Sequence, residues 1–255
     1  MQIPILSQLH AQGIAPEILF WVGCSGSYDA RAQKVSRSFA EILNIAGISF
    51  AILGNEEKCT GDPARRAGNE FMFQMLATQN IETLNMYGVK KIVCTCPHCF
   101  NTLKNEYPEL GGNYEVMHHS QFLQELLRDG KIKIQTEKEA VSYHDSCYLG
   151  RVNDIYEAPR STIEALQVEI KEMKRSRKNG LCCGAGGAQM FKEEENGDKR
   201  INIERIDEIL ANNTSKVVAN CPFCITMLQD GIKARDQQDK IMVYDLSELI
   251  LERIV

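Results

Sequence analysis

The chain has 255 residues, 44% of them hydrophobic and 25% charged, a balance typical of a globular protein with a sizeable core. Its net charge of -5 at pH 7 argues against nucleic-acid binding, which needs clustered positive charge. No apolar run is long enough to cross a bilayer, and the first residues lack the basic flank of a signal peptide. These features predict a cytoplasmic protein, in which ten cysteines indicate metal or redox chemistry rather than disulfides.

Short apolar runs alternate with amphipathic segments through the first half of the chain. Strands are expected at residues 18–22, 48–53, 91–93 and 114–117, and helices at residues 29–46, 68–87 and 121–128. Gly47 and Gly88, which follow the first two helices, are typical stop signals. This alternation favours an α/β fold with mostly parallel strands.

The second half of the chain repeats this order. Strands are expected at residues 140–143, 168–173, 216–219 and 242–244, followed by a helix at residues 246–254. A polar stretch with a glycine turn, residues 129–139, separates the two halves. The predicted organisation is therefore two tandem, pseudo-symmetric α/β domains, residues 1–130 and 131–255.

Nine of the ten cysteines form a pattern that occurs twice. Each set begins after an expected strand, continues 35 positions later and ends in Cys-Pro-x-Cys. The first set is Cys24, Cys59, Cys96 and Cys99, and the second set is Cys147, Cys182, Cys183, Cys221 and Cys224. A doubled grouping of thiols in a reducing compartment predicts two metal centres.

The positions of these thiols suit metal binding. Proline is favoured in the first turn of a helix, so each Cys-Pro-x-Cys predicts a helix that begins directly after a strand. Backbone N–H groups at a helix start favour negative thiolates, and the expected clusters should approach the surface there. The other cysteines follow neighbouring strands, and ligands collect at the C-terminal ends of parallel strands. Glycines after Cys183 let backbone N–H groups approach cluster sulfur closely.

The second set, Cys147–x34–Cys182-Cys183-Gly184–x36–Cys221-Pro222-Phe223-Cys224, resembles the CCG domain of heterodisulfide-reductase-type iron–sulfur proteins. The resemblance extends over about residues 18–250. It implies a non-cubane [4Fe-4S] cluster held by the five cysteines of the second set. In the first set, Thr60 stands where the second cysteine of the adjacent pair belongs. The four remaining thiolates suit a cubane [4Fe-4S] cluster.

Several residues near the cysteines have two interpretations. Cys94 could compensate for Thr60 as a ligand, or it could be a core thiol at the end of a strand. His144 is placed to hydrogen-bond or deliver a proton to the second cluster, and core packing is the alternative. Arg65 and Arg66 could balance cluster charge or bind an anionic partner, and a salt bridge at a helix start is the alternative.

A histidine pair, His118 and His119, follows the fourth expected strand. These side chains could face a site, and a surface or structural role is the alternative. No catalytic residue is predicted.

The chain lacks a Gly-x-Gly-x-x-Gly run after a strand and has no flavin motif, so another protein must supply its electrons. Together with the resemblance, this predicts an electron-transfer subunit of a heterodisulfide reductase-like oxidoreductase. Such a subunit would pass electrons between a flavoprotein or ferredoxin-domain partner and a quinone-linked or thiol acceptor. Any association of the chain with a membrane subunit would occur through this flavoprotein or ferredoxin-domain partner.

Three other functions fit parts of the pattern. A disulfide or thiol-substrate reductase would act at the five-cysteine cluster. A structural zinc protein would also use Cys-x-x-Cys pairs, but 121 residues separate Cys99 from Cys221, too many for a compact zinc site. A structural zinc ion also binds only four ligands, and the second set has five thiols. A thiol–disulfide exchanger would use Cys96 and Cys99 and leave the doubled pattern unexplained.

Overall fold

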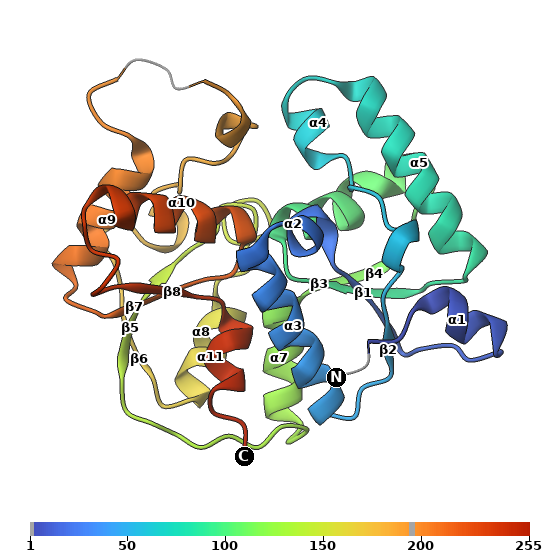
Figure 1. Cartoon of the computed structure of the whole chain (residues 1–255), viewed down its shortest axis with the longest axis horizontal. Coiled ribbons are helices and arrows are strands. Elements are labelled where there is room, and N and C mark those ends of the chain that lie inside the picture. The colour runs from blue at the N-terminus through green and yellow to red at the C-terminus, as the bar shows by residue number, and fades with distance from the viewer. Residues whose placement is uncertain (1–2, 194–196) are drawn as a thin grey trace. The chain divides into compact units, whose positions relative to one another are not determined.

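The computed structural model describes residues 3–193 and 197–255, and the chain divides into two compact units, Met1–Ile132 and Lys133–Val255. Each unit contains one four-stranded parallel sheet with helices on both faces (Figure 1). The predicted α/β fold class and the two tandem repeats are confirmed. Among the residues that the structure describes, none of the helices is long and apolar enough to cross a bilayer.

The sheet of the first unit has the strand order β2-β1-β3-β4, and every neighbouring pair is parallel. Its strands are β1 (Ile18–Trp21), β2 (Phe50–Ala51), β3 (Lys91–Cys94) and β4 (Glu115–His118). All residues of β1 are buried, as expected for a central strand that helices cover on both faces.

Local signals explain where the helices of the first unit begin. They are α1 (Leu6–Ala11), α2 (Gly23–Tyr28), α3 (Ala30–Ile45), α4 (Asp62–Arg66), α5 (Glu70–Met86), α6 (Pro97–Asn101) and α7 (His119–Arg128). Asp29 caps α3 by accepting a hydrogen bond from the N–H of Ala32 at 2.7 Å. Phe39 of α3 then packs edge-to-face on Phe20 of β1, with 5.0 Å between the ring centroids, and so fixes the helix on the sheet.

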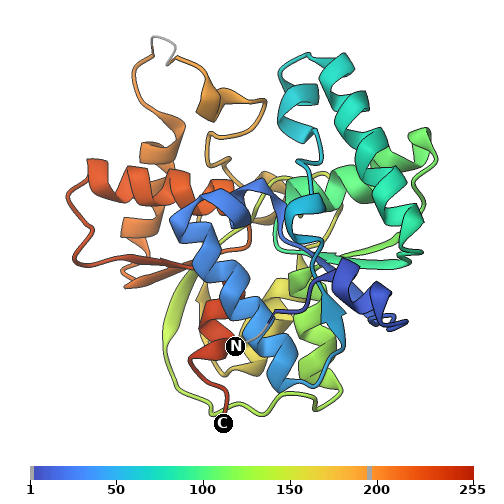
Figure 2. The same ribbon diagram turned by 45° about the vertical axis from the view of Figure 1, so that its right-hand side comes forward.

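The second unit repeats this architecture with the strand order β6-β5-β7-β8, again all parallel. Its strands are β5 (Ala140–His144), β6 (Glu169–Lys171), β7 (Lys216–Ala219) and β8 (Met242–Tyr244). Its helices are α8 (Glu157–Ala165), α9 (Ile201–Ala211), α10 (Pro222–Ala234) and α11 (Leu246–Leu251). Figures 1 and 2 show α9 and α10 together on one face of this sheet and α8 and α11 on the other.

The strand order creates a crevice in each unit. The first strand of each repeat lies between the second and the third, so the chain leaves the two central strands toward opposite sides. Ligands of open α/β sheets bind at this switch point, beyond the C-terminal ends of the strands. The pairing register of the two central strands is also equivalent in the two sheets. The last residue of β1, Trp21, pairs with Cys94 of β3, and the last residue of β5, His144, pairs with Ala219 of β7.

The predicted elements differ from the observed ones mainly at the sheet edges. The expected strand at residues 48–53 is reduced to Phe50–Ala51, and the one at residues 168–173 to Glu169–Lys171. Both are edge strands, which have a pairing partner on one side only. The helices α1, α2, α4, α8 and α9 were not predicted.

Candidate metal centres

The first cysteine set converges at the crevice of the first sheet. Cys24 lies in α2 directly after β1, Cys59 lies in the loop after β2, and Cys96 and Cys99 lie at the start of α6 after β3. The Cys24 thiol donates a hydrogen bond that lowers the pKa of Cys59 to about 7. The Cys99 thiol likewise contacts Cys96, and all four residues are free cysteines. The structure thus brings together the four thiols predicted for this set.

Thr60 lies in the first set where a cysteine lies in the second. Its buried hydroxyl is 3.9 Å from the Sγ atom of Cys99. In the second unit, the Sγ atoms of Cys183 and Cys224 are 3.4 Å apart. Thr60 and Cys183 therefore have the same neighbour, the last cysteine of Cys-Pro-x-Cys, and a hydroxyl replaces the fifth thiol.

The second set converges in the same way. Hydrogen bonds from the thiols of Cys147 and then Cys183 hold the pKa of Cys182 well below its usual range. The backbone N–H of Gly184 also donates to Cys182 Sγ at 3.3 Å. Gly184 has a φ of +93°, a conformation that favours glycine and turns this N–H toward the sulfur.

Cys221 and Cys224 complete the second set at the start of α10. Both are buried, and their thiols contact each other. Hydrogen bonds to Cys183 and Cys221, with burial, raise the pKa of Cys224 well above that of a free thiol. Five thiols of this unit are therefore within reach of one another in a largely buried site.

His144 lies at the end of β5, beside the second set. One of its ring nitrogens is within 4.8 Å of the Sγ atoms of Cys183 and Cys224. Arg205 of α9 donates from Nε to His144 Nδ1 at 3.0 Å. Burial, and next the charge of Arg205, lower the pKa of His144 to about 3, so the ring is neutral.

Glu57 organises the first site and was not predicted. Its carboxylate accepts hydrogen bonds from the backbone N–H groups of Val22 at 3.1 Å and Gly23 at 2.6 Å. Burial raises the pKa of this carboxyl to about 7. The contact ties the loop that carries Cys59 to the junction between β1 and α2, next to Cys24. Because the partners are backbone groups more than 30 positions away, no side-chain pattern in the sequence indicates it.

A buried ion pair supports the start of α6. Nδ1 of His98, the variable residue of the first Cys-Pro-x-Cys, lies 2.9 Å from Asp62 Oδ2. Burial opposes the charge on Asp62, but His98 and Arg66 together lower its pKa. Arg65 and Arg66 also pair with Glu106, so the predicted salt bridges are present, but in the last turn of α4 and not at a helix start.

The histidine pair after β4 has a structural role. His118 and His119 are both buried, which makes the surface interpretation wrong. His118 caps α7, with Nδ1 2.8 Å from Ser120 Oγ and Nε2 3.3 Å from the carbonyl oxygen of Thr95. β4 ends at His118 and α7 begins at His119, so the chain passes from the strand into the helix without a loop.

Cys94 is fully buried at the end of β3. Its thiol contacts the carbonyl oxygens of Cys96 at 3.7 Å and Met117 at 3.9 Å. Burial raises the pKa of this thiol well above its usual range. These contacts resemble those of a packed core thiol.

The exposed edge of each site differs from the expected one. The sequence predicted that the sites approach the surface at the Cys-Pro-x-Cys helix starts, but all four of those cysteines are buried. The half-buried cysteines are Cys24 and Cys59 in the first unit and Cys147 and Cys182 in the second. The thiols at the helix starts are therefore not the exposed ones, although Pro222 and Phe223 between Cys221 and Cys224 are half-buried. Cys59 and Cys182 instead follow edge strands, where the sheet gives less cover.

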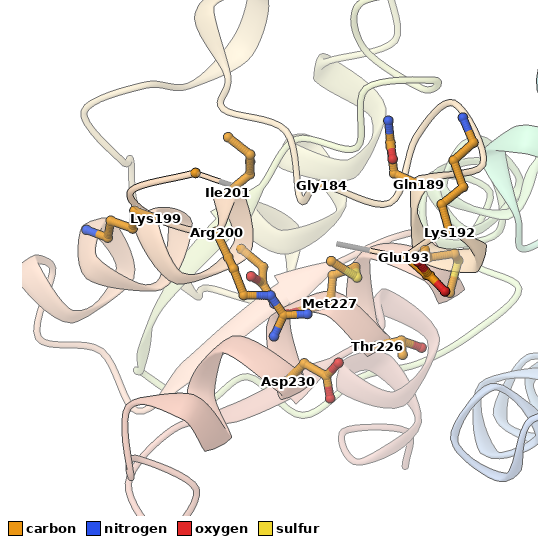
Figure 3. Close-up of a pocket in the computed structure, with 13 residues that line it drawn as sticks. Gly184, Gln189, Lys192, Glu193, Lys199, Arg200, Ile201, Thr226, Met227 and Asp230 are labelled. Atoms are coloured by element: carbon orange, nitrogen blue, oxygen red, sulfur yellow. The ribbon is translucent and has the colours of Figure 1, made fainter. Parts of the chain in front are cut away.

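Two adjoining cavities open beside the second site. One, of about 440 Å³, is lined by Cys182, Arg151 and Arg175. The other, of about 630 Å³, lies between the loop after Cys183 and the helices α9 and α10 (Figure 3). Its lining includes Lys192 and Arg200, and Gly184, Gln189 and Ile201 border both cavities.

The donor sets fit iron–sulfur clusters better than zinc. Four thiols match the usual ligand number of a cubane cluster, and five exceed what a tetrahedral zinc ion accepts. Backbone N–H groups and a neutral imidazole beside the thiols are suitable donors to cluster sulfur.

Comparisons with known proteins agree with this chemistry. A model of the cysteine-rich domain CCG matches the chain twice, over residues 18–104 and 141–229. Similar proteins include "Probable iron-sulfur-binding oxidoreductase FadF" of Bacillus subtilis, 49% identical over 256 residues. "EtfAB:quinone oxidoreductase" of Syntrophomonas wolfei is 45% identical over 241 residues. A component of the dihydromethanophenazine:CoB–CoM heterodisulfide reductase of Methanosarcina barkeri is 34% identical over 246 residues.

These relatives are longer than the chain. The matches cover 100%, 92% and 93% of this chain, but 36%, 34% and 59% of the relatives in the same order. The chain therefore spans about a third of the first two proteins. A crystal structure of a hypothetical protein from Helicobacter pylori has a similar fold over 93% of this chain and 49% of its own, with a TM-score of 0.61 and 9% identity.

Proposed function

The chain belongs to the family of CCG cysteine-rich domains, and on this basis we propose that it binds two iron–sulfur clusters and transfers electrons between partner proteins. The observation that carries the proposal is the convergence of nine thiols in two groups at equivalent crevices of two similar sheets. Each group lies within one unit, so we propose that each unit, with a boundary near residues 130–133, is one cluster-binding domain.

The ligands follow from the two thiol groups. Cys24, Cys59, Cys96 and Cys99 would hold a cubane [4Fe-4S] cluster, and Cys147, Cys182, Cys183, Cys221 and Cys224 a non-cubane one. A bound iron–sulfur cluster supplies one-electron oxidation and reduction. The N–H of Gly184 helps to stabilise thiolate charge at the second site, and Glu57 holds the two loops of the first site together.

The names of the relatives suggest the partners. They include a quinone oxidoreductase and a component of a heterodisulfide reductase, and all of them are longer than this chain. We propose that the chain works within a larger oxidoreductase, between a flavoprotein or ferredoxin-domain donor and a quinone-linked or thiol acceptor. The half-buried thiols Cys24, Cys59, Cys147 and Cys182 would then lie on the side where electrons enter and leave.

Metal analysis after anaerobic purification tests the proposal directly. We expect about eight irons and about eight acid-labile sulfides per chain, with broad visible absorbance that dithionite bleaches. A chain that contains one or two zinc ions and no absorbance would refute it. Reoxidation of the reduced protein by a water-soluble quinone would support the electron-transfer role.

The cavities at Cys182 favour a second candidate, a disulfide or thiol-substrate reductase. Cys182 is half-buried and lines a cavity of about 440 Å³ beside basic side chains, where an anionic sulfur compound could reach the second site. Consumption of a disulfide by the purified chain with reduced viologen as the electron donor separates the candidates. Catalytic turnover favours the reductase, and its absence from an iron-loaded protein that quinone reoxidises favours electron transfer.

A further inference from the structure

His144 has a polar group that the protein leaves without a partner. The side chain is fully buried at the end of β5, three positions before Cys147. Its Nδ1 is 3.0 Å from Arg205 Nε, while its Nε2 has no hydrogen-bond partner among the described residues. A buried polar group of this kind destabilises the fold unless a partner satisfies it.

Arg205 determines which ring nitrogen carries the proton. A guanidinium can only donate, so Nδ1 must accept, and the proton of the neutral ring is on Nε2. Arg205 is itself held in place, because its Nη1 donates to Glu208 Oε2 at 2.6 Å and to the carbonyl oxygen of Arg175 at 2.8 Å. The imidazole is therefore fixed in one orientation as an N–H donor.

The surroundings of the ring contain suitable acceptors. A ring nitrogen of His144 lies within 4.8 Å of the sulfurs of Cys183 and Cys224. Thiolate and sulfide sulfur accept hydrogen bonds, and such bonds stabilise the more negative, reduced form of an iron–sulfur cluster.

We propose that His144 donates a hydrogen bond from Nε2–H to sulfur of the second cluster, either a ligand Sγ or a sulfide, and thereby raises its reduction potential. The inference rests on the proposed function, since it requires a cluster at the second site. Arg205 is the positioning residue that directs the N–H toward the sulfur.

The first unit contains an equivalent group. Trp21 is the last residue of β1 and lies three positions before Cys24, as His144 lies three positions before Cys147. Trp21 pairs with Cys94 of the neighbouring strand, and His144 pairs in the same way with Ala219. The Trp21 side chain is also fully buried, and its Nε1 has no hydrogen-bond partner among the described residues. The same place in both repeats thus contains a ring N–H group, as expected if that group serves the site.

The test compares two variants of the iron-loaded chain. His144→Phe removes the N–H, whereas His144→Gln keeps an N–H donor and an oxygen that can accept from Arg205. In a redox titration followed by electron paramagnetic resonance, we expect a more negative potential of the second cluster in His144→Phe. The potential in His144→Gln should stay close to that of the native chain, and the first cluster should not change. An unchanged second potential in His144→Phe would overturn the proposal.

A measurement on the native chain covers the case in which His144→Phe does not fold. With ¹⁵N-labelled histidine, pulsed resonance spectroscopy should detect a weak nitrogen coupling to the reduced second cluster. No coupling, or a strong coupling that indicates direct coordination, would refute the donor role. Iron content separates this outcome from failure of the proposed function: a chain without iron contradicts both ideas, and a loaded chain without the coupling contradicts this one alone.

Discussion

Thr60 is the residue that distinguishes the two cysteine sets most clearly. It lies 3.9 Å from Cys99, where the second set has Cys183 at 3.4 Å from Cys224. A hydroxyl is neutral near pH 7 and is a much weaker iron ligand than a thiolate. The proposed difference in ligand number between the two centres therefore depends on one side chain, and a single substitution can test it.

Thr60→Cys should give the first site a fifth thiol. We expect the resonance spectrum of the first cluster to shift toward that of the second, because the new sulfur lies beside Cys99 as Cys183 lies beside Cys224. The matched control is Thr60→Ser, which keeps the hydroxyl and should keep the native spectrum. If the iron-loaded Thr60→Cys protein has the native spectrum of the first cluster, position 60 does not determine the type of centre.

Among the elements, α8 is fixed to the second sheet by a buried arginine. Arg160 bonds Asp145 through Nη1 and Nη2 at 2.7 and 2.9 Å, and Glu172 through Nε at 2.7 Å. Asp145 lies two positions before Cys147 and also accepts the backbone N–H of Arg177 at 2.7 Å. This network connects α8 to both loops that lead to the half-buried thiols of the second set.

Arg160→Ala should destabilise the second unit by about 3–5 kcal/mol, because it leaves the buried Asp145 carboxylate unpaired. Urea denaturation under anaerobic conditions, followed by circular dichroism, measures the change. Arg128→Ala is the control, since Arg128 forms an exposed ion pair with Asp129 whose loss should leave the stability nearly unchanged. Equal midpoints for the two variants would contradict a bracing role for Arg160.

The elements show how far the sequence alone could lead. Central strands and the helices that follow Cys-Pro-x-Cys were predicted because apolar runs and proline act locally. The helices α8 and α9 were missed because their buried faces include the charged residues Arg160 and Arg205, which interrupt the apolar pattern. These arginines are paired with Asp145 and His144, which lie elsewhere in the sequence. The roles of Glu57 and Arg205 depend on contacts 34 and 61 positions away, which a single sequence does not reveal.

At the scale of the whole molecule, each unit contains every thiol of its own set. The chain also spans only about a third of two similar oxidoreductases. A proposed electron carrier without a nucleotide or flavin motif depends on a protein donor.

Gentle anaerobic purification of the native protein should therefore recover a second iron–sulfur protein or a flavoprotein with it. Mass spectrometry identifies the co-purified protein, and high salt should weaken the complex if charged groups guide docking. The control is the same purification from cells that do not produce this chain. Recovery of the chain alone, with full physiological electron transfer, would contradict a role within a larger complex.

The contact between Cys147 and Cys182 has a consequence for assembly. Both thiols are half-buried and touch each other, and the hydrogen bonds that Cys182 accepts from Cys147 and Cys183 lower its pKa and so favour its thiolate form. Before iron is loaded, oxygen can take two electrons from this pair and be reduced to peroxide, while Cys147 releases its proton and the two sulfurs join as a disulfide. We expect air-exposed, metal-free chain to lose reconstitution at the second site until dithiothreitol is added, with the linked peptides visible by mass spectrometry. Cys24 and Cys59 of the first site are also half-buried and in contact, so the same treatment should link them as well, and peptides that stay unlinked after air exposure would contradict this expectation. Maturation of the second centre thus has to be completed before oxygen reaches the unprotected ligands.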